Sequence, residues 1–399
     1  MWYNCGMKIK VFLAVLACKC CRSLIRFLCR GGTDFPGRVA LKICPNLLGE
    51  LAKGVTTVIV TGTNGKTTTS RMIEQSWTDA GISFFANKSG ANLLSGVTAE
   101  FAVHSSLTGK CRYTHALIES DEAAFKAISR FVDAKAVVVT NVFRDQLDRY
   151  GEVTHTLDNI RIGIENSKNA VLCVNADDSL CASLHDVLPN PVVFFGVDTP
   201  IYHDRVEELS DAPYCIRCKH EYVYDYVTYG HLGGYRCPNC GYHRPQPQVH
   251  VTKVLRTDDE HSEVIFEENG KQVPASIHLP GGYNIYNACA CMAAKNAPAF
   301  SSAATRNCLP STRTVSMLPS SVQAAQGVSA SIGAISSASS RSELSAAETT
   351  TQSSSLSWAV CSRPNSRALM ISTKSGCSYS SCKGRSSVSM VTGTNTGAA

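Results

Sequence analysis

Residues 61–68, which read Thr-Gly-Thr-Asn-Gly-Lys-Thr-Thr, constrain the fold of this chain more than any other segment. They follow a short apolar run at residues 57–60 that is typical of a buried strand, and they precede an expected helix over residues 67–80. A glycine-rich turn at the mouth of a helix presents backbone N–H groups and a positive helix end to an anion. In such a turn, Lys66 would reach the outer phosphates of a nucleotide and the Thr67 hydroxyl would ligate Mg²⁺.

The glycine spacing in this turn departs from the common phosphate-binding loop, because Gly62 and Gly65 are three positions apart rather than five. Taken without its surroundings, such a run could be a chance turn. Its place between a strand pattern and an amphipathic helix favours a phosphate-binding function.

Apolar runs of buried-strand type recur along the chain and alternate with helical patterns. Strands that alternate with helices predict an α/β domain with a mainly parallel sheet and helices on both faces. Near the end of this region, Asn269-Gly270 between two short apolar runs predicts a β-hairpin. The expected strands lie at residues 57–60, 115–118, 136–139, 170–174, 192–195, 264–266 and 273–277.

Four cysteines form two close pairs, which indicates metal binding. Each pair has two intervening residues, and an 18-residue spacer separates the pairs. Two such pairs can place four thiolates around one Zn²⁺ ion, and a filled site of this kind is structural rather than catalytic. A redox dithiol or two disulfides is the alternative. We therefore predict a zinc ribbon over residues 212–245, packed by its tyrosines and with these ligands: Cys215, Cys218, Cys237 and Cys240.

The first 36 residues combine apolar and basic side chains. Lys19, Arg22 and Arg26 follow an apolar stretch that is too short to span a bilayer. This pattern favours a basic amphipathic helix that packs on the protein or rests on the inner membrane leaflet, and a secretory signal is the alternative. The net charge of +6 is compatible with phosphate binding or an anionic membrane, and it does not single out nucleic acid.

The composition changes abruptly after Asn296. Residues 301–399 contain 28 serines, no aspartate and two glutamates. Such a segment cannot bury enough apolar surface to offset the entropy of ordering it. We predict that residues 297–399 are disordered or, as we favour, that a reading-frame slip near residue 296 replaces a C-terminal domain.

The motifs together resemble the Mur ligase family, over roughly residues 20–296. The run at residues 61–69 resembles the family's ATP-binding signature, and Glu119 begins a stretch like its acidic motif. Residues 140–148 resemble its TN-x-x-x-DQLD segment, and residues 280–287 resemble its closing motif. The resemblance implies a Mur ligase central domain over residues 37–296 with the following sites: ATP at Gly62, Thr63, Asn64, Gly65, Lys66, Thr67, Thr68, Asn284 and Asn287, and Mg²⁺ at Thr67 and Glu119.

Some of these assignments have alternatives. Glu119 could be a solvated carboxylate at a strand end, and Asn284 and Asn287 could be helix caps. Asp121 and Glu122 are weaker candidates for metal binding, because adjacent acids usually face water.

Residues 87–93, residues 143–152 and the cysteine ribbon resemble the amidating members of the family. This likeness implies a cytoplasmic synthetase subunit that converts the α-carboxylate of D-glutamate in lipid II to the amide through an acyl phosphate. Ammonia would come from a separate, GatD-like glutaminase subunit, and lipid II would be met at the inner face of the membrane. The alternatives are an amino-acid-adding Mur ligase, a folylpolyglutamate synthase, or a catalytically inactive nucleotide-binding scaffold.

The inactive alternative follows from the C-terminal segment. The catalytic aspartate of the amidating members lies in their C-terminal domain, and this chain has no aspartate after Asp259. The catalytic residue is therefore unassigned, and we expect weak ATP binding without turnover from the chain as written.

Overall fold

The computed structural model describes residues 2–28, 34–87, 90–143, 152–201 and 211–297, which all fall in one compact unit. The predictions made for residues 144–151 and 298–399 therefore lie outside the described residues. Most of the TN-x-x-x-DQLD segment and the whole serine-rich segment are among them.

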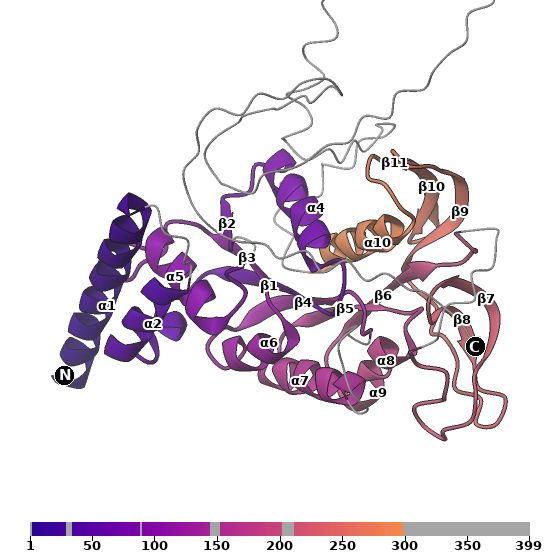
Figure 1. The fold of residues 1–399 in the computed structure, drawn as a ribbon, viewed down its shortest axis with the longest axis horizontal. Helices are drawn as coiled ribbons and strands as arrows, with labels where there is room; N and C mark the ends of the chain where they lie inside the picture. The colour runs from indigo at the N-terminus through magenta and orange to yellow at the C-terminus, as the bar shows by residue number, and fades with distance from the viewer. Residues whose placement is uncertain (1, 29–33, 88–89, 144–151, 202–210, 298–399) are drawn as a thin grey trace, which may run out of the picture. The chain divides into compact units, whose positions relative to one another are not determined.

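A nine-stranded sheet forms the centre of the described fold (Figure 1). Its order is β11-β10-β9-β6-β5-β4-β1-β3-β2, and every pairing from β2 to β9 is parallel. The mainly parallel α/β fold predicted from the sequence is therefore confirmed. The strands are β1 (Thr56–Thr61), β2 (Phe84–Ala86), β3 (His115–Glu119), β4 (Ala134–Val139), β5 (Val171–Asn175), β6 (Val192–Val197), β9 (Val249–Thr257), β10 (Ser262–Glu268) and β11 (Lys271–Ile277).

The predicted hairpin is formed by β10 and β11, which pair antiparallel with Glu268 opposite Lys271. The two residues of the turn, Asn269 and Gly270, have φ values of 51° and 74°. Positive φ at both positions matches the right-handed twist of the strands, which is why Asn-Gly predicts such a turn.

Helices cover both faces of the sheet. In Figure 1, α4 (Lys66–Asp79) and α10 (Tyr283–Asn296) lie on one face, with α6 (Glu122–Ile128), α7 (Glu152–Asn166), α8 (Ser179–Ala182) and α9 (Leu184–Val187) on the other. Side chains of β1 alternate between the two layers. Val58 and Val60 share an apolar cluster with Ile73 and Trp77 of α4, whereas Ile59 joins a cluster that contains Phe125 of α6. This burial on both faces explains the continuous apolar pattern of the strand.

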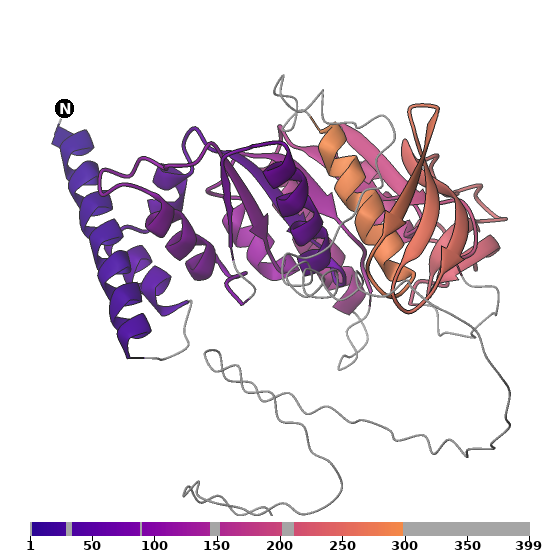
Figure 2. The same ribbon diagram turned by 90° about the horizontal axis from the view of Figure 1, so that it is seen from above.

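The N-terminal region is helical. Helix α1 (Trp2–Phe27) packs against α2 (Phe35–Ile43) and α5 (Leu94–His104), as Figure 2 shows, and α3 (Leu47–Leu51) contacts α5. Among the residues that the structure describes, none of the helices is both long and apolar enough to cross a membrane.

The segment between β6 and β9 contains a separate two-stranded sheet, formed by β7 (Val223–Tyr229) and β8 (Leu232–Arg236). Its tyrosines pack together as expected. Tyr235 is fully buried, and its ring lies 5.1 Å from that of Tyr222 and 6.0 Å from that of Tyr242, centroid to centroid. Tyr229 instead contacts Phe143 of the main domain. We call residues 211–245 the insertion.

Candidate nucleotide and metal sites

Residues 61–68, which we call the glycine loop, connect β1 to α4. Gly62 and Gly65 have φ values of 118° and 80°, a backbone conformation that residues with a side chain rarely adopt. A Cβ atom at Gly62 would lie 2.4 Å from Thr140 Oγ1, and one at Gly65 would lie 2.1 Å from Asn287 Oδ1. Both glycines are therefore required by backbone conformation and by close packing.

The carboxyl end of β4 holds the glycine loop in place. Thr140 Oγ1 donates to Asn64 O at 2.7 Å, and Asn141 Oδ1 accepts from Asn64 N at 2.9 Å. The Asn141 amide also donates to Asn64 O at 3.1 Å, and Thr63 N donates to Asn141 O at 2.9 Å. These hydrogen bonds from the residues after β4 fix the loop backbone, because the loop itself has no helical or sheet hydrogen bonds around Thr63 and Asn64.

Lys66 and Thr67, the first residues of α4, bring a cation and a hydroxyl to the mouth of the helix. Thr67 Oγ1 donates to Glu119 Oε1 at 2.8 Å, so the two predicted Mg²⁺ ligands are adjacent. Lys66 Nζ donates to the backbone oxygen of Thr63 at 3.0 Å and lies 3.7 Å from Glu122 Oε1. The structure thus brings a cation and two hard oxygens to the same end of α4.

Asn87 fixes the end of β3 that carries Glu119. Its amide donates to Glu119 O, its Oδ1 accepts from Glu119 N, and both distances are 2.8 Å. The Asn87 side chain is buried, so this reciprocal pair is protected from water. Residues 87–93 were part of the predicted family resemblance, but no role was predicted for Asn87. An asparagine directly after a short strand was the available signal.

The acidic neighbours of Glu119 do not simply face water, contrary to the expectation from sequence. Asp121 caps α6 by accepting from Ala124 N at 2.6 Å. Glu122 is only 19% exposed and forms the ion pair with Lys66. The expectation failed because adjacent acids at a helix start can satisfy a backbone N–H or meet a cation from another element.

Asn284 and Asn287 lie inside α10, and both are buried. The N-cap is Gly282, so the alternative that these asparagines cap the helix is wrong. Asn287 Nδ2 donates to Asn284 Oδ1 at 2.9 Å, and its Oδ1 accepts from Thr69 Oγ1 of α4 at 3.3 Å. Asn287 therefore joins α10 to α4 directly behind Gly65.

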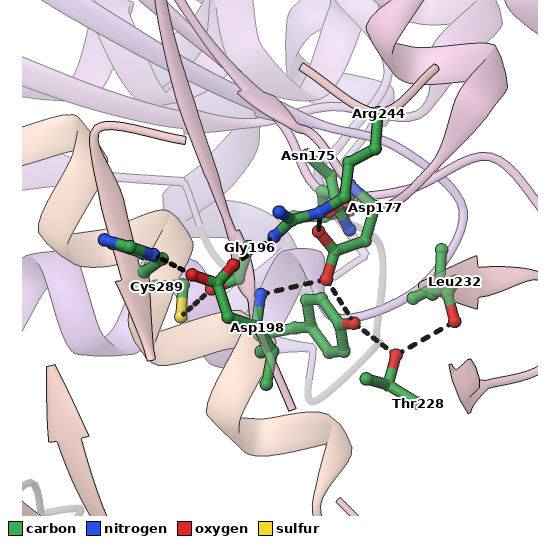
Figure 3. A network of polar contacts seen from close by, with 12 residues as sticks. Asn175, Asp177, Gly196, Asp198, Thr228, Leu232, Arg244 and Cys289 are labelled. Atoms are coloured by element: carbon green, nitrogen blue, oxygen red, sulfur yellow. Dashed lines mark hydrogen bonds and ion pairs between the residues drawn. The ribbon is translucent and has the colours of Figure 1, made fainter. Parts of the chain in front are cut away.

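A buried polar network, which the sequence did not suggest, lies at the carboxyl ends of β5 and β6 (Figure 3). Asp177 is fully buried and accepts from Arg244 Nε at 2.6 Å and from Tyr286 OH at 2.6 Å. Arg244 also binds Asp198 at 2.7 Å. Burial raises the pKa of the Asp177 carboxyl, and the adjacent Arg244 guanidinium acts in the opposite direction. Because Arg244 comes from the insertion, this network attaches the insertion to the sheet.

The four predicted metal ligands come together. Their Sγ atoms all lie within 4.8 Å of one another, so the cluster could bind a metal ion. Cys215 Sγ is 3.6 Å from Cys240 Sγ, and Cys218 Sγ is 3.4 Å from Cys237 Sγ. All four cysteines are free, so the alternative of two disulfides finds no support in this geometry. We call these residues the four-cysteine cluster.

Two equivalent turns carry the cluster. Cys215 N donates to His220 O at 2.7 Å in the first turn, and Cys237 N donates to Tyr242 O at 2.7 Å in the second. The paired turns let thiols from two separate segments converge on one point.

The family model of the Mur ligase middle domain matches residues 60–225, which include most of the glycine loop. The family resemblance predicted from the sequence is thus confirmed. Two curated relatives are named lipid II isoglutaminyl synthase (glutamine-hydrolyzing) subunit MurT. The Streptococcus pneumoniae protein is 34% identical over 293 residues, which cover 72% of this chain and 62% of the relative. The Staphylococcus aureus protein is 31% identical over 290 residues, which cover 71% and 62%.

The chain therefore spans less than two thirds of the length of these curated relatives. A solved structure, a pseudomurein peptide ligase type C from Methanothermus fervidus, is 24% identical with a TM-score of 0.47. That match covers 61% of this chain and 46% of the other.

Proposed function

We propose that this chain is the ATP-dependent synthetase subunit of an enzyme that amidates the α-carboxylate of D-glutamate in lipid II. The proposal is supported by the likeness to the MurT relatives and by one local observation. At the start of α4, the Lys66 ammonium contacts the glycine loop, and the next residue, Thr67, is hydrogen-bonded to Glu119. A cation next to two hard oxygens suits a magnesium-bound triphosphate.

The donor set fits Mg²⁺, because Mg²⁺ prefers hydroxyl and carboxylate oxygens together with phosphate oxygens. In our proposal Thr67 and Glu119 hold the ion, which neutralises charge on the phosphoryl oxygens when bound. The backbone N–H groups of the glycine loop and the start of α4 face the phosphates, and Lys66 stabilises the negative charge that develops during transfer. Asn287 lies behind Gly65, and this position supports the proposal that α10 contacts the rest of the nucleotide.

In the proposed reaction, a carboxylate oxygen of D-glutamate attacks the γ-phosphorus of ATP, and the bond to the bridging oxygen breaks to release ADP. Ammonia then attacks the acyl carbon of the resulting acyl phosphate. Phosphate leaves with the former carboxylate oxygen, the nitrogen loses one proton, and the product is the amide. Ammonia would come from a glutaminase subunit, in accord with the words "glutamine-hydrolyzing" in the names of the relatives. ATP as a substrate implies a cytoplasmic location.

We further propose that the four-cysteine cluster holds a structural Zn²⁺ ion. Four thiolates fill a tetrahedral shell and leave no open position for a substrate. The insertion is too small to support a large apolar core, so the ion would supply much of its folding free energy.

Nucleotide binding tests the first part of the proposal. Isothermal titration with Mg-ATP compares the unaltered chain with Lys66→Ala and with Lys53→Ala, whose side chain is 68% exposed on the surface. We expect Lys66→Ala to weaken binding roughly tenfold to a hundredfold, because hydrogen bonds to charged groups contribute about 1.5–3 kcal/mol. Lys53→Ala should bind like the unaltered chain. Equal affinity of all three folded proteins would refute the site.

Amidation tests the second part. The chain is incubated with lipid II, Mg-ATP and ammonium chloride, which replaces the glutaminase, and mass spectrometry follows conversion of the carboxylate to the amide. Amide formation that depends on ATP and Lys66 supports the synthetase. Tight nucleotide binding without any amide would favour a nucleotide-binding scaffold, and transfer of an added amino acid would favour an amino-acid-adding ligase.

A further inference from the structure

Helix α1 exposes an apolar stripe along its length. Seven of the sixteen exposed large apolar side chains among the described residues fall between residues 9 and 28. At about 100° per residue, those on the helix occupy an arc of roughly 120°. The stripe consists of Ile9, Phe12, Leu13, Leu16, Leu24 and Phe27, which are between 39% and 84% exposed.

The opposite side of α1 is attached to the protein. Val11, Ala14, Val15 and Cys18 are buried there, against a region that includes α2 and α5. Arg22 reaches Glu100 of α5 at 3.0 Å, and the Glu100 side chain is only 4% exposed. The apolar stripe is therefore held in a fixed direction, away from the fold.

Three exposed cations of α1 lie between these two sides. By helical spacing, exposed Lys8 and Arg26 flank the stripe on one edge, and exposed Lys10 flanks it on the other. The helix contains no aspartate or glutamate. A second copy of α1 would bring like charges together, whereas an anionic surface would complement them on both edges.

We infer that α1 lies flat on an anionic lipid bilayer, with the apolar stripe in the acyl boundary and Lys8, Lys10 and Arg26 at the level of the phosphates. An apolar face flanked by cations is the arrangement of interfacial helices. The buried side remains on the protein, so the docked helix joins the bilayer to the fold without spanning the membrane. This inference goes beyond the proposed reaction and does not depend on nucleotide binding.

Vesicle cosedimentation tests the inference. The full chain is mixed with phosphatidylcholine vesicles that contain or lack phosphatidylglycerol, at low and high salt. We expect binding to the anionic vesicles that falls as salt rises, because salt screens the contribution of the cations. Leu24→Asp should lower the partition coefficient about tenfold or more, since it places a charge in the apolar boundary. Lys8→Gln should lower it roughly fivefold on anionic vesicles.

Leu255→Asp is the matched control, because Leu255 on β9 is 58% exposed, as is Leu24. It should bind vesicles like the unaltered chain, and circular dichroism and thermal unfolding should show that all variants are folded. Absence of binding to anionic vesicles by the folded, unaltered chain would overturn the inference. So would an equal loss in Leu255→Asp, or a stable dimer in sedimentation that Leu24→Asp dissociates while vesicles remain unbound.

Discussion

The ring of His231 lies against the ring of Phe143, with centroids 4.5 Å apart. His231 lies in the turn that precedes β8 of the insertion, and Phe143 follows the end of β4 that holds the glycine loop. Phe143 N donates to Thr63 Oγ1 at 3.1 Å, and Thr63 Oγ1 donates to Phe143 O at 3.3 Å. Phe143, which Tyr229 also contacts, therefore links the insertion to the glycine loop.

We expect His231→Ala to weaken Mg-ATP binding about threefold to tenfold, because the change leaves a cavity beside Phe143 and weakens the hydrogen bonds between Phe143 and Thr63. Isothermal titration measures the change. Val223→Ala is the control, since Val223 lies at the start of the same hairpin and is 41% exposed. If His231→Ala binds the nucleotide as tightly as the control, the contact with Phe143 has no influence on the loop.

Metal removal should act through the same contact. A chelator that strips the four-cysteine cluster should unfold the insertion and weaken nucleotide binding by a similar factor. In His231→Ala the chelator should have little additional effect, because coupled changes are not additive. Metal analysis by mass spectrometry provides the stoichiometry. A chelated protein that keeps full affinity for the nucleotide would contradict the coupling.

The two turns of the four-cysteine cluster differ in one informative way. Lys219 and Gly241 occupy the same position, after the second cysteine of each pair, and have φ values of 62° and 74°. The left-handed conformation costs a non-glycine residue roughly 1–2 kcal/mol. Lys219→Gly should therefore raise stability by up to about 1 kcal/mol, and Gly241→Ala should lower it by about 1 kcal/mol.

Chemical denaturation of the metal-loaded protein measures both of these changes. No heavy atom would lie within 4 Å of a Cβ at Gly241, so the loss there reports backbone strain rather than a clash. Two changes of the same sign would contradict the equivalence of the turns.

Arg244 neutralises a carboxylate that has no access to water. Arg244→Met should destabilise the protein by about 3–5 kcal/mol, because it leaves the Asp177 charge buried and unpaired. Arg236→Met is the comparison: its ion pair with Asp225 is exposed, so the cost should stay below about 1 kcal/mol. In denaturant titrations, the double variant Asp177→Asn with Arg244→Met should be less destabilised than Arg244→Met alone.

The contribution of His250 to the stability of the folded protein should depend on pH. Its Nδ1 bonds Asp198 Oδ2 at 2.5 Å, and this hydrogen bond raises the pKa of His250 above its usual value. A raised folded pKa means that the stabilisation is complete below the unfolded pKa of about 6.5 and is lost as the pH rises through the folded value. His250→Gln should therefore cost more stability at acidic than at alkaline pH, above the range in which Asp198 itself titrates.

Thermal unfolding between pH 5.5 and 9 checks this expectation. In an Asp198→Asn background, the stability cost of His250→Gln should be nearly the same at both ends of this range. A cost of His250→Gln that grows toward alkaline pH would show that the charge of the imidazole is not what stabilises the fold.

Local patterns predicted much of the fold from the sequence. The apolar run of β1, the glycines of the loop and the start of α4 lie within a few residues of one another, so their structure follows from short-range rules. Asn269-Gly270 specified a hairpin for the same reason. Equal spacing in the two cysteine pairs indicated that four thiols from separate turns would meet.

The supporting contacts could not be predicted, because they join residues far apart in the chain. Glu122 meets Lys66 across two elements, and Asp177 meets Arg244 across 67 positions. No local pattern marks such pairs, since each residue alone resembles an ordinary surface charge. The role of Asn87 was missed as well, because a position after a short strand does not by itself distinguish a buried asparagine from one in an exposed turn.

The hydrogen bonds from Thr140 and Asn141 to Asn64 have a consequence for ligand binding to the glycine loop. They shape the glycine loop before any ligand arrives, so the loss of conformational freedom there occurs when the chain folds. An incoming phosphate group then encounters donors already set in position, and association should proceed without a slow rearrangement of this segment.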